Sequence, residues 1–539
     1  MTTEQDSQNS SESELPDLPT SLLSRSPLGW ISLFGPGAIV ASVTIGTGEL
    51  IFSTRGGVLF GYNILSLFVF ISLLKWVLVF GTSKHLLLTG IHPFRRMMDL
   101  PGPRGWLLMM LLIMICISQP IWVSFHCSTL GNYIALLTGT SDSLNGAAQF
   151  LWGILLVALV VTLSLSGRYN MMERIQIVVV ACLMVAAVIS LILYNPDYFA
   201  LLKGFLTPVF GDYPKWIPLK FEEIGKTPKW VELTTYVGVV GGAGFDYMAY
   251  TTWLRDKRWG FAGSNPPSEQ QLQSIANDPQ HPARIWLKAP LIDCGISFLL
   301  IVAFSAVFVT SGVELLGPRE EIPDSSNMLG QQSEILTQVH PWLYSLYVFG
   351  AILTMFGTLY GALEIGIAIA TEILRSFNHN WTNANRRRVE RMALAWQCCF
   401  STVVTLAMFT VVWGAETAAS SNPAKEIILQ VMRPVNLFTG VLSCGIFCLV
   451  NLWMEKTCTL KQLQSATWVH GLYVFAGIVF LVLGLKGYWD IHNPEGGLIQ
   501  SRWFSIVGVI LVTLLSLLIV NAFSRWFSKK TTVESGDPA

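Results

Sequence analysis

The sequence predicts an all-α polytopic membrane protein with about twelve membrane-spanning helices. Its 539 residues are 52% hydrophobic and 13% charged, whereas a soluble domain carries about 25% charged residues. Long apolar runs recur along the chain, and two of them are interrupted near their centres by glycine-rich stretches. The formal net charge is zero, which argues against a nucleic-acid partner.

Each predicted span is long enough to cross a hydrocarbon core of about 30 Å, which takes about 20 residues. The polar residues 1–27 are expected to form a disordered cytoplasmic tail, and residues 528–539 a second cytoplasmic tail. Residues 28–527 then form one transmembrane domain. Its spans are expected at 28–60, 62–83, 105–137, 149–166, 172–194, 233–254, 288–311, 341–374, 392–414, 425–451, 465–486 and 501–527.

The basic residues of the loops indicate the orientation. Most Lys and Arg residues lie on one side of the predicted membrane, including the cluster Arg386-Arg387-Arg388. Because cytoplasmic loops are enriched in basic residues, both termini are expected in the cytoplasm. Membrane lipid is the surrounding partner, and the plasma membrane is the expected location.

The first interruption reads Gly46-Thr47-Gly48-Glu49 and lies near the middle of the first span. Glycine weakens a helix by about 1 kcal/mol relative to alanine. Unwound backbone at membrane depth is tolerated only where it is buried in protein or lines a cavity. We therefore expect the first span to be a broken helix.

The second interruption lies in the sixth span and carries one carboxylate, Asp246, as the first carries Glu49. Two such breaks at corresponding positions of two halves mark the substrate site of a transporter. The predicted substrate-binding residues are Gly46, Thr47, Glu49, Gly242, Phe245, Asp246 and Tyr247.

The chemistry of these stretches favours a hard cation. A half-helix that ends at a break offers unpaired carbonyls, and Glu49 and Asp246, the predicted metal ligands, add carboxylate oxygens. Oxygen ligands favour Mg²⁺, Mn²⁺ or Ca²⁺ over softer metals. A structural alternative is that each acid caps a half-helix. A charge at mid-membrane costs at least about 2.5 kcal/mol, which favours a functional role.

Several motifs resemble the Nramp family of divalent-metal transporters, over residues 28–460. The resemblance implies a LeuT-type fold with broken helices 1 and 6. Two inverted repeats, 28–194 and 233–451, would be followed by two extra helices within 465–527. The motifs are Gly35-Pro36-Gly37, the first break, Gly56-Gly57, Gly61-Tyr62 and the basic segment Arg386 to Arg391.

The break residues depart from this family. Where the family has Asp-Pro-Gly-Asn, the chain has Gly46 at the aspartate and Glu49 at the asparagine. Where the family has Met-Pro-His in the sixth span, the chain has Phe245, Asp246 and Tyr247. The ligands are therefore argued from this chain's own chemistry.

Other polar residues inside spans are candidates for coupling or gating: His126, Glu364 and Arg433. Lys75 is a further charge inside a span. Two carboxylates in one site would also titrate as a pair, which is one route to proton coupling. If Arg433 pairs with Glu49 or Asp246, a divalent cation fits the site less well and an organic ion or anion fits better.

These observations predict a secondary active transporter for a hard divalent cation. The alternatives are a transporter of another small solute, such as an organic ion, and a membrane sensor that binds without transport. The chain has no His-Glu-x-x-His, Gly-x-Ser-x-Gly or phosphate-loop pattern. We therefore expect neither enzymatic activity nor a cofactor.

Overall fold

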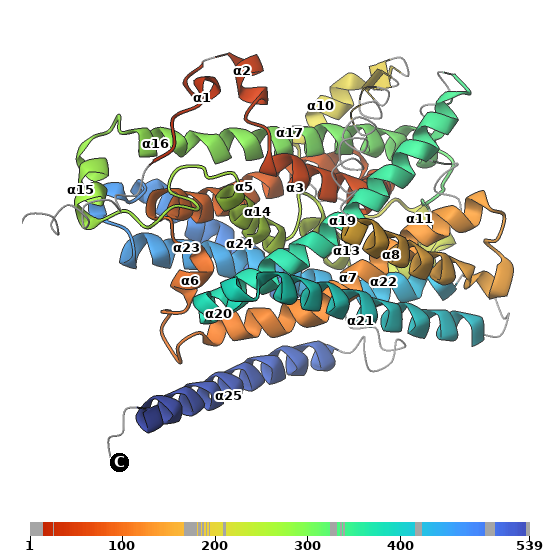
Figure 1. The fold of residues 1–539 in the computed structure, drawn as a ribbon. Coiled ribbons are helices and arrows are strands. Elements are labelled where there is room, and N and C mark those ends of the chain that lie inside the picture. The colour runs from red at the N-terminus through yellow and green to blue at the C-terminus, as the bar shows by residue number, and fades with distance from the viewer. Residues whose placement is uncertain are drawn as a thin grey trace, which may run out of the picture.

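A computed structural model describes most of the chain. The described residues are 15–24, 26–166, 195–208, 212–323, 340–414, 423–490 and 502–534, with isolated residues between 181 and 192 and between 331 and 337. Within these ranges every regular element is a helix, and the long helices form one bundle (Figure 1). The final long helix, α25 (Arg502–Glu534), lies along the outside of the bundle against α7 (Trp106–Leu137).

The elements of the bundle follow the predicted apolar runs. Besides α7 and α25 they are α3 (Pro36–Thr44), η1 (Ile45–Glu49), α4 (Leu50–Phe60), α5 (Ile64–Thr89), α8 (Ala148–Ser166), α13 (Lys229–Val239), α14 (Gly244–Asp256), α17 (Lys288–Ser311), α19 (Leu343–Phe377), α21 (Arg386–Gly414), α22 (Pro423–Asn436), η5 (Leu437–Leu442), α23 (Ser443–Thr457) and α24 (Thr467–Asp490).

Short helices connect them. They are α1 (Thr20–Leu23), α2 (Pro27–Ile31), η2 (Gly61–Asn63), α6 (Pro93–Met97), η3 (Ser143–Gly146), α10 (Tyr198–Leu206), α11 (Trp216–Lys220), α12 (Glu222–Lys226), α15 (Glu269–Asn277), α16 (Pro282–Trp286), η4 (Gly312–Leu316), α20 (His379–Ala384) and η6 (Lys461–Leu463).

Length and composition identify seven segments of the described chain that can cross a membrane: Phe52–Thr89, Trp106–Leu137, Pro282–Leu316, Leu343–Phe377, Arg386–Gly414, Val431–Thr457 and Thr467–Asp490. The chain is a multi-pass integral membrane protein. Most of the span expected at 172–194 lies outside the described residues. The count of twelve stays a prediction.

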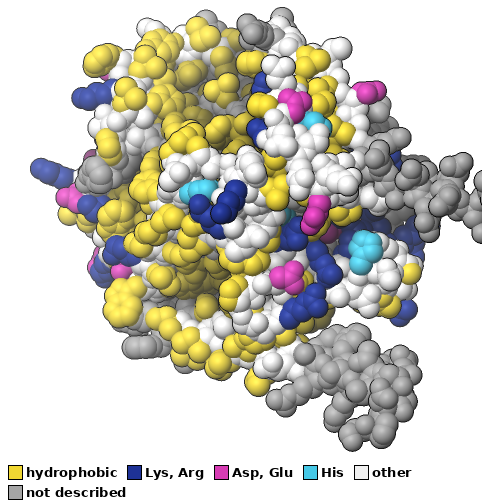
Figure 2. Space-filling model, turned by 90° about the vertical axis from the view of Figure 1, so that its left-hand side faces the viewer, with side chains coloured by type: hydrophobic (Ala, Val, Ile, Leu, Met, Phe, Trp, Pro, Cys, Tyr) yellow, Lys and Arg dark blue, Asp and Glu magenta, His cyan; other side chains and the backbone are white. Residues whose placement is uncertain are grey.

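The surface agrees with a lipid environment. Figure 2 shows hydrophobic side chains over much of one face, with the charged groups gathered in a few places. Large apolar side chains are exposed along α21 and α24, among them Trp396, Phe400 and Phe475. Because a soluble monomer rarely exposes large contiguous apolar patches, these helices are suited to face lipid.

Helices α4 and α17 pack with almost no space between their backbones. A Cβ atom on Gly57 of α4 would overlap the carbonyl oxygen of Val309 on α17. The two helices could approach this closely only because residue 57 has no side chain. This contact fixes α4, and with it the second half of the interrupted first span.

We expect Gly57→Ala to lower the melting temperature of the purified protein in detergent. Overpacking of this kind costs about 1–3 kcal/mol. The matched control is Gly295→Ala on α17, where a Cβ would meet nothing within 4 Å and better helix propensity favours alanine. Equal melting temperatures for the two variants would contradict the tight α4–α17 contact.

Candidate functional site

The first break lies at Gly46, between α3 and α4. Its backbone leaves helical geometry, with φ −68° and ψ −119°. Gly46 packs against α19 so closely that a Cβ would overlap Thr358 Oγ1. The side chain of Thr47, which follows it, lies outside the described part of the chain.

The second break separates α13 from α14 at two glycines. Gly241 and Gly242 have φ values of +76° and +91°, a region that costs other L-residues about 1–2 kcal/mol. A Cβ on Gly242 would lie 3.4 Å from Thr44 Oγ1, at the end of α3. The fold therefore brings the two breaks together, as two halves of one site require.

Glu49 is completely buried at the start of α4. Its Oε2 accepts hydrogen bonds from Ser53 Oγ (2.6 Å) and from Ser305 Oγ on α17 (2.5 Å). Its Oε1 is buried without a well-formed hydrogen bond among the described residues. Lys75 and the backbone amide of Gly241 act on this carboxylate electrostatically. Glu49 thus belongs to the first break and faces the second.

Asp246 is the third residue of α14 and is only partly buried. Its Oδ2 accepts a 2.6 Å hydrogen bond from the backbone N–H of Ala243. This is the capping role that the sequence left open as an alternative. The cap uses one carboxylate oxygen, so Asp246 keeps a second oxygen for another partner.

Lys75 lies between these groups and is the residue that sequence reasoning underestimated. It is completely buried on α5. Its Nζ donates to three carbonyl oxygens, those of Val237 (2.8 Å), Val240 (2.6 Å) and Gly242 (2.5 Å). Glu49 and Asp246 are both among its electrostatic partners. A lysine at the centre of a long apolar helix was the available signal.

The carbonyls expected to be unpaired at the end of α13 are therefore occupied. Besides the three that Lys75 holds, the Gly241 carbonyl accepts from Tyr247 Oη and the Val239 carbonyl from Gly242 N–H at 3.2 Å. At the end of α13 the expectation of free carbonyl ligands is wrong, because the protein supplies its own donors. The hydrogen bond from Tyr247 Oη therefore stabilises the backbone of the break.

Phe245 also has a packing role. It is buried in the main hydrophobic cluster and meets Phe447 edge-on, with ring centroids 5.9 Å apart. Among the described residues, no three His, Cys, Asp or Glu side chains gather in a metal-binding group. The acidic part of the candidate site therefore consists of Glu49 and Asp246.

Comparison with known proteins identifies the family. The family model described as "Natural resistance-associated macrophage protein-like" matches residues 37–437, more than half of the chain. The chain belongs to the Nramp family. The predicted family and fold class are confirmed.

Several curated transporters from Listeria species are similar to part of the chain. Those named "Divalent metal cation transporter MntH", from Listeria welshimeri, Listeria monocytogenes and Listeria innocua, are 26% identical over 181 residues. That match covers 32% of this chain and spans only 38% of the relatives' length. A match over this part of the relatives does not show the activity of the whole chain.

Solved structures support the Nramp fold over nearly the whole chain. The Eremococcus coleocola manganese transporter, bound to an aromatic bis-isothiourea compound, superimposes with a TM-score of 0.63 and 15% identity. The alignment covers 96% of this chain and 99% of that one. A single-residue variant of the same transporter gives 0.64 and 16%. Identities this low support the fold alone.

The three candidate coupling or gating residues lie in different environments. His126 is buried and stacks on Trp122, with ring centroids 5.6 Å apart. Glu364 accepts a 2.5 Å hydrogen bond from Tyr360 Oη. Arg433 lies 3.6 Å from Glu232. The described contacts of these residues therefore do not join them to the break carboxylates.

Arg433 belongs to a cluster of three charges around the buried Glu232 that sequence reasoning missed. Glu232 on α13 pairs with Arg55 on α4 at 2.7 Å and with Arg433 on α22 at 3.6 Å. The condition under which Arg433 would disfavour a divalent cation, pairing with Glu49 or Asp246, is not met. The cation at the Nramp-type breaks is Lys75 instead.

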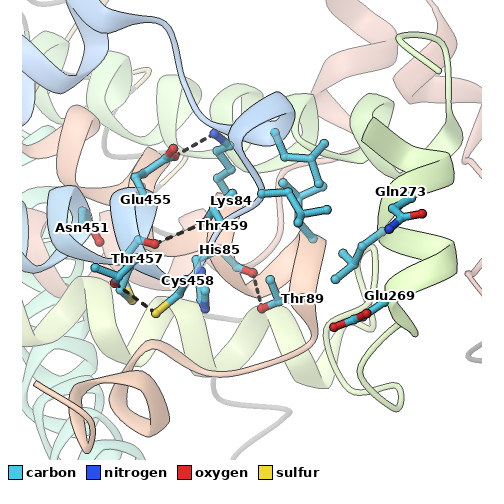
Figure 3. Close-up of a pocket in the computed structure, with 16 residues that line it drawn as sticks. Lys84, His85, Thr89, Glu269, Gln273, Asn451, Glu455, Thr457, Cys458 and Thr459 are labelled. Atoms are coloured by element: carbon cyan, nitrogen blue, oxygen red, sulfur yellow. Dashed lines mark hydrogen bonds and ion pairs between the residues drawn. The ribbon is translucent and has the colours of Figure 1, made fainter. Parts of the chain in front are cut away.

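A partly open pocket of about 330 Å³ lies elsewhere, between the ends of α5 and α23 and helix α15 (Figure 3). An ion pair between Lys84 and Glu455 (2.7 Å) lies on one side of it, and Glu269 and Gln273 of α15 lie on the other. The residues that line this pocket include none of the break residues.

Proposed function

We propose that this Nramp-family chain is a secondary active transporter that binds a hard divalent cation, Mg²⁺ or Mn²⁺, between its two helix breaks. The observation that carries the proposal is Glu49, a fully buried carboxylate whose Oε1 has no well-formed hydrogen bond in the described structure. Burying a carboxylate is costly unless it gains a partner. A cation entering from the break supplies that partner.

Asp246 extends the same argument. It flanks the second break, is partly exposed and shares Lys75 with Glu49 as an electrostatic partner. Two carboxylates suit a hard divalent ion, and no sulfur or imidazole ligand stands at the matching break positions. The name of the MntH relatives supports a metal substrate. Proton exchange at the carboxylate pair is the proposed coupling.

A small organic cation is the second candidate, and Lys75 is the observation that favours it. The two carboxylates and one ammonium leave a formal charge of −1, which one monovalent cation neutralises. Such a cation needs only carboxylate partners and not the carbonyls that Lys75 holds. Orientation with both termini in the cytoplasm of a plasma membrane remains part of the proposal, supported by the basic residues of the loops.

Flux measurements in proteoliposomes test the proposal. We expect the purified full-length protein to take up Mn²⁺ or Mg²⁺ above the level of protein-free vesicles, with competition between the two ions. Uptake of a small amine that no divalent cation inhibits would favour the second candidate. Binding of Mn²⁺ by the purified protein without flux would identify a sensor and contradict transport.

A further inference from the structure

The contacts of Lys75 are those that a bound metal ion would make. An ammonium has three donors and no acceptor, and here three carbonyl oxygens lie 2.5–2.8 Å from Nζ. These carbonyls lie at the end of α13, where the helix dipole concentrates partial negative charge. The Lys75 ammonium thus occupies the position at the end of α13 where a metal ion could bind.

A divalent cation bound between the breaks would compete for the same oxygens. Hard divalent ions take six or more oxygen ligands, and the two carboxylates offer four at most. Glu49 Oε2 is already engaged by two serines and Asp246 Oδ2 by the Ala243 amide. The remaining ligands would have to be water or backbone carbonyls, and Lys75 now holds three of the carbonyls at the second break.

Charge adds to this competition. Lys75 has both Glu49 and Asp246 as electrostatic partners, so an entering cation and the ammonium would share them. Two cations a few ångströms apart in a low-dielectric interior repel strongly. The substrate and the ammonium cannot both occupy the end of α13.

We infer that the Lys75 ammonium competes with the transported cation for the carbonyls of Val237, Val240 and Gly242, which the cation can reach only when Lys75 leaves them. This inference rests on the proposed divalent-cation function. Two buried acceptors without a well-formed hydrogen bond in the described structure, Glu49 Oε1 and Ser72 Oγ, belong to the same cluster. They can receive the displaced ammonium. Lys75 thereby sets the affinity and selectivity of the site.

Removing the charge of Lys75 tests the inference. Lys75→Gln keeps two N–H donors for the carbonyls but is neutral, whereas Lys75→Arg keeps the charge. We expect Lys75→Gln to bind Mn²⁺ at least about tenfold more tightly than the wild type by isothermal titration calorimetry. Lys75→Arg should show no such gain. Unchanged or weaker Mn²⁺ binding by folded Lys75→Gln would overturn the inference.

A second variant keeps the lysine, in case Lys75→Gln does not fold. Ser72 lies one turn before Lys75 on α5, so the carboxylate of Ser72→Asp would draw the ammonium towards it. Ser72→Asn is the neutral control. Tighter Mn²⁺ binding by Ser72→Asp alone supports competition, and equal binding by the two variants contradicts it.

Wild-type flux separates this inference from the proposed function. Mn²⁺ uptake by the wild type, together with no gain in Mn²⁺ affinity in either variant, retains the function and overturns the inference. No divalent-cation uptake by the wild type, together with tight Mn²⁺ binding by Lys75→Gln, overturns the function. It also supports Lys75 as the group that excludes the metal.

Discussion

Glu49→Gln is expected to reduce Mn²⁺ or Mg²⁺ uptake to the level of protein-free vesicles, a loss of at least about 100-fold. Glutamine has the shape of glutamate and still accepts from Ser53 and Ser305, so the fold should persist. It lacks the negative charge that an entering cation would need. Asp246→Asn should give the same loss, because it also removes a negative charge. Its fold should persist, because the amide oxygen can still accept the hydrogen bond from the Ala243 N–H. Uptake of radioactive or fluorescently detected ions into proteoliposomes provides the measurement.

Glu314→Gln is the matched control for this loss. Glu314 in η4 accepts a 2.8 Å hydrogen bond from Tyr62 Oη in η2, and none of its described contacts is with a break residue. Its variant should transport as the wild type does. Normal uptake by both Glu49→Gln and Asp246→Asn would show that neither carboxylate takes part in transport, and the site between the breaks would have to be abandoned.

Glu232→Ala is expected to destabilise the protein more than any other single change considered. Glu232 is buried between two arginines, with its side chain 4% exposed. Its removal leaves two partly buried arginines, Arg55 and Arg433, without their carboxylate partner, and breaking a buried pair costs about 3–5 kcal/mol. We expect a large fall in melting temperature, or loss of monodisperse protein, in thermal unfolding and size-exclusion chromatography in detergent.

The control for Glu232→Ala is Glu222→Ala in the nearby helix α12. Glu222 pairs with Lys226 at 2.7 Å, but both side chains are exposed. Exposed ion pairs contribute little to stability, so this variant should unfold like the wild type. A Glu232→Ala protein as stable as the Glu222→Ala protein would show that water or relaxation compensates the two arginines.

Much of the fold could be predicted from local sequence. The apolar run at 288–311 becomes α17 with the same two ends, because a buried membrane helix has a strong compositional signal. The glycine-rich stretches also mark the interruptions correctly, since Gly46, Gly241 and Gly242 adopt backbone geometries or contacts that a side chain would prevent.

The partners of the charged residues could not be predicted in the same way. Lys75 reaches carbonyls 162, 165 and 167 residues further along the chain. Arg55 and Glu232 are 177 residues apart. Such pairs depend on how the helices pack, and composition or periodicity contains no information on it. The sequence thus indicated where the breaks lie but not what saturates their carbonyls.

The long separation between Lys75 and α13 has a consequence for biogenesis. Bare carbonyls in hydrocarbon cost several kcal/mol each, so a newly made interrupted helix is a hazard during insertion. Helix α5 leaves the ribosome well before α13, so the Lys75 ammonium is already in the bilayer when α13 is inserted. In a circular permutant in which α13 is synthesised before α5, the carbonyls at the end of α13 would be exposed to lipid until Lys75 is inserted.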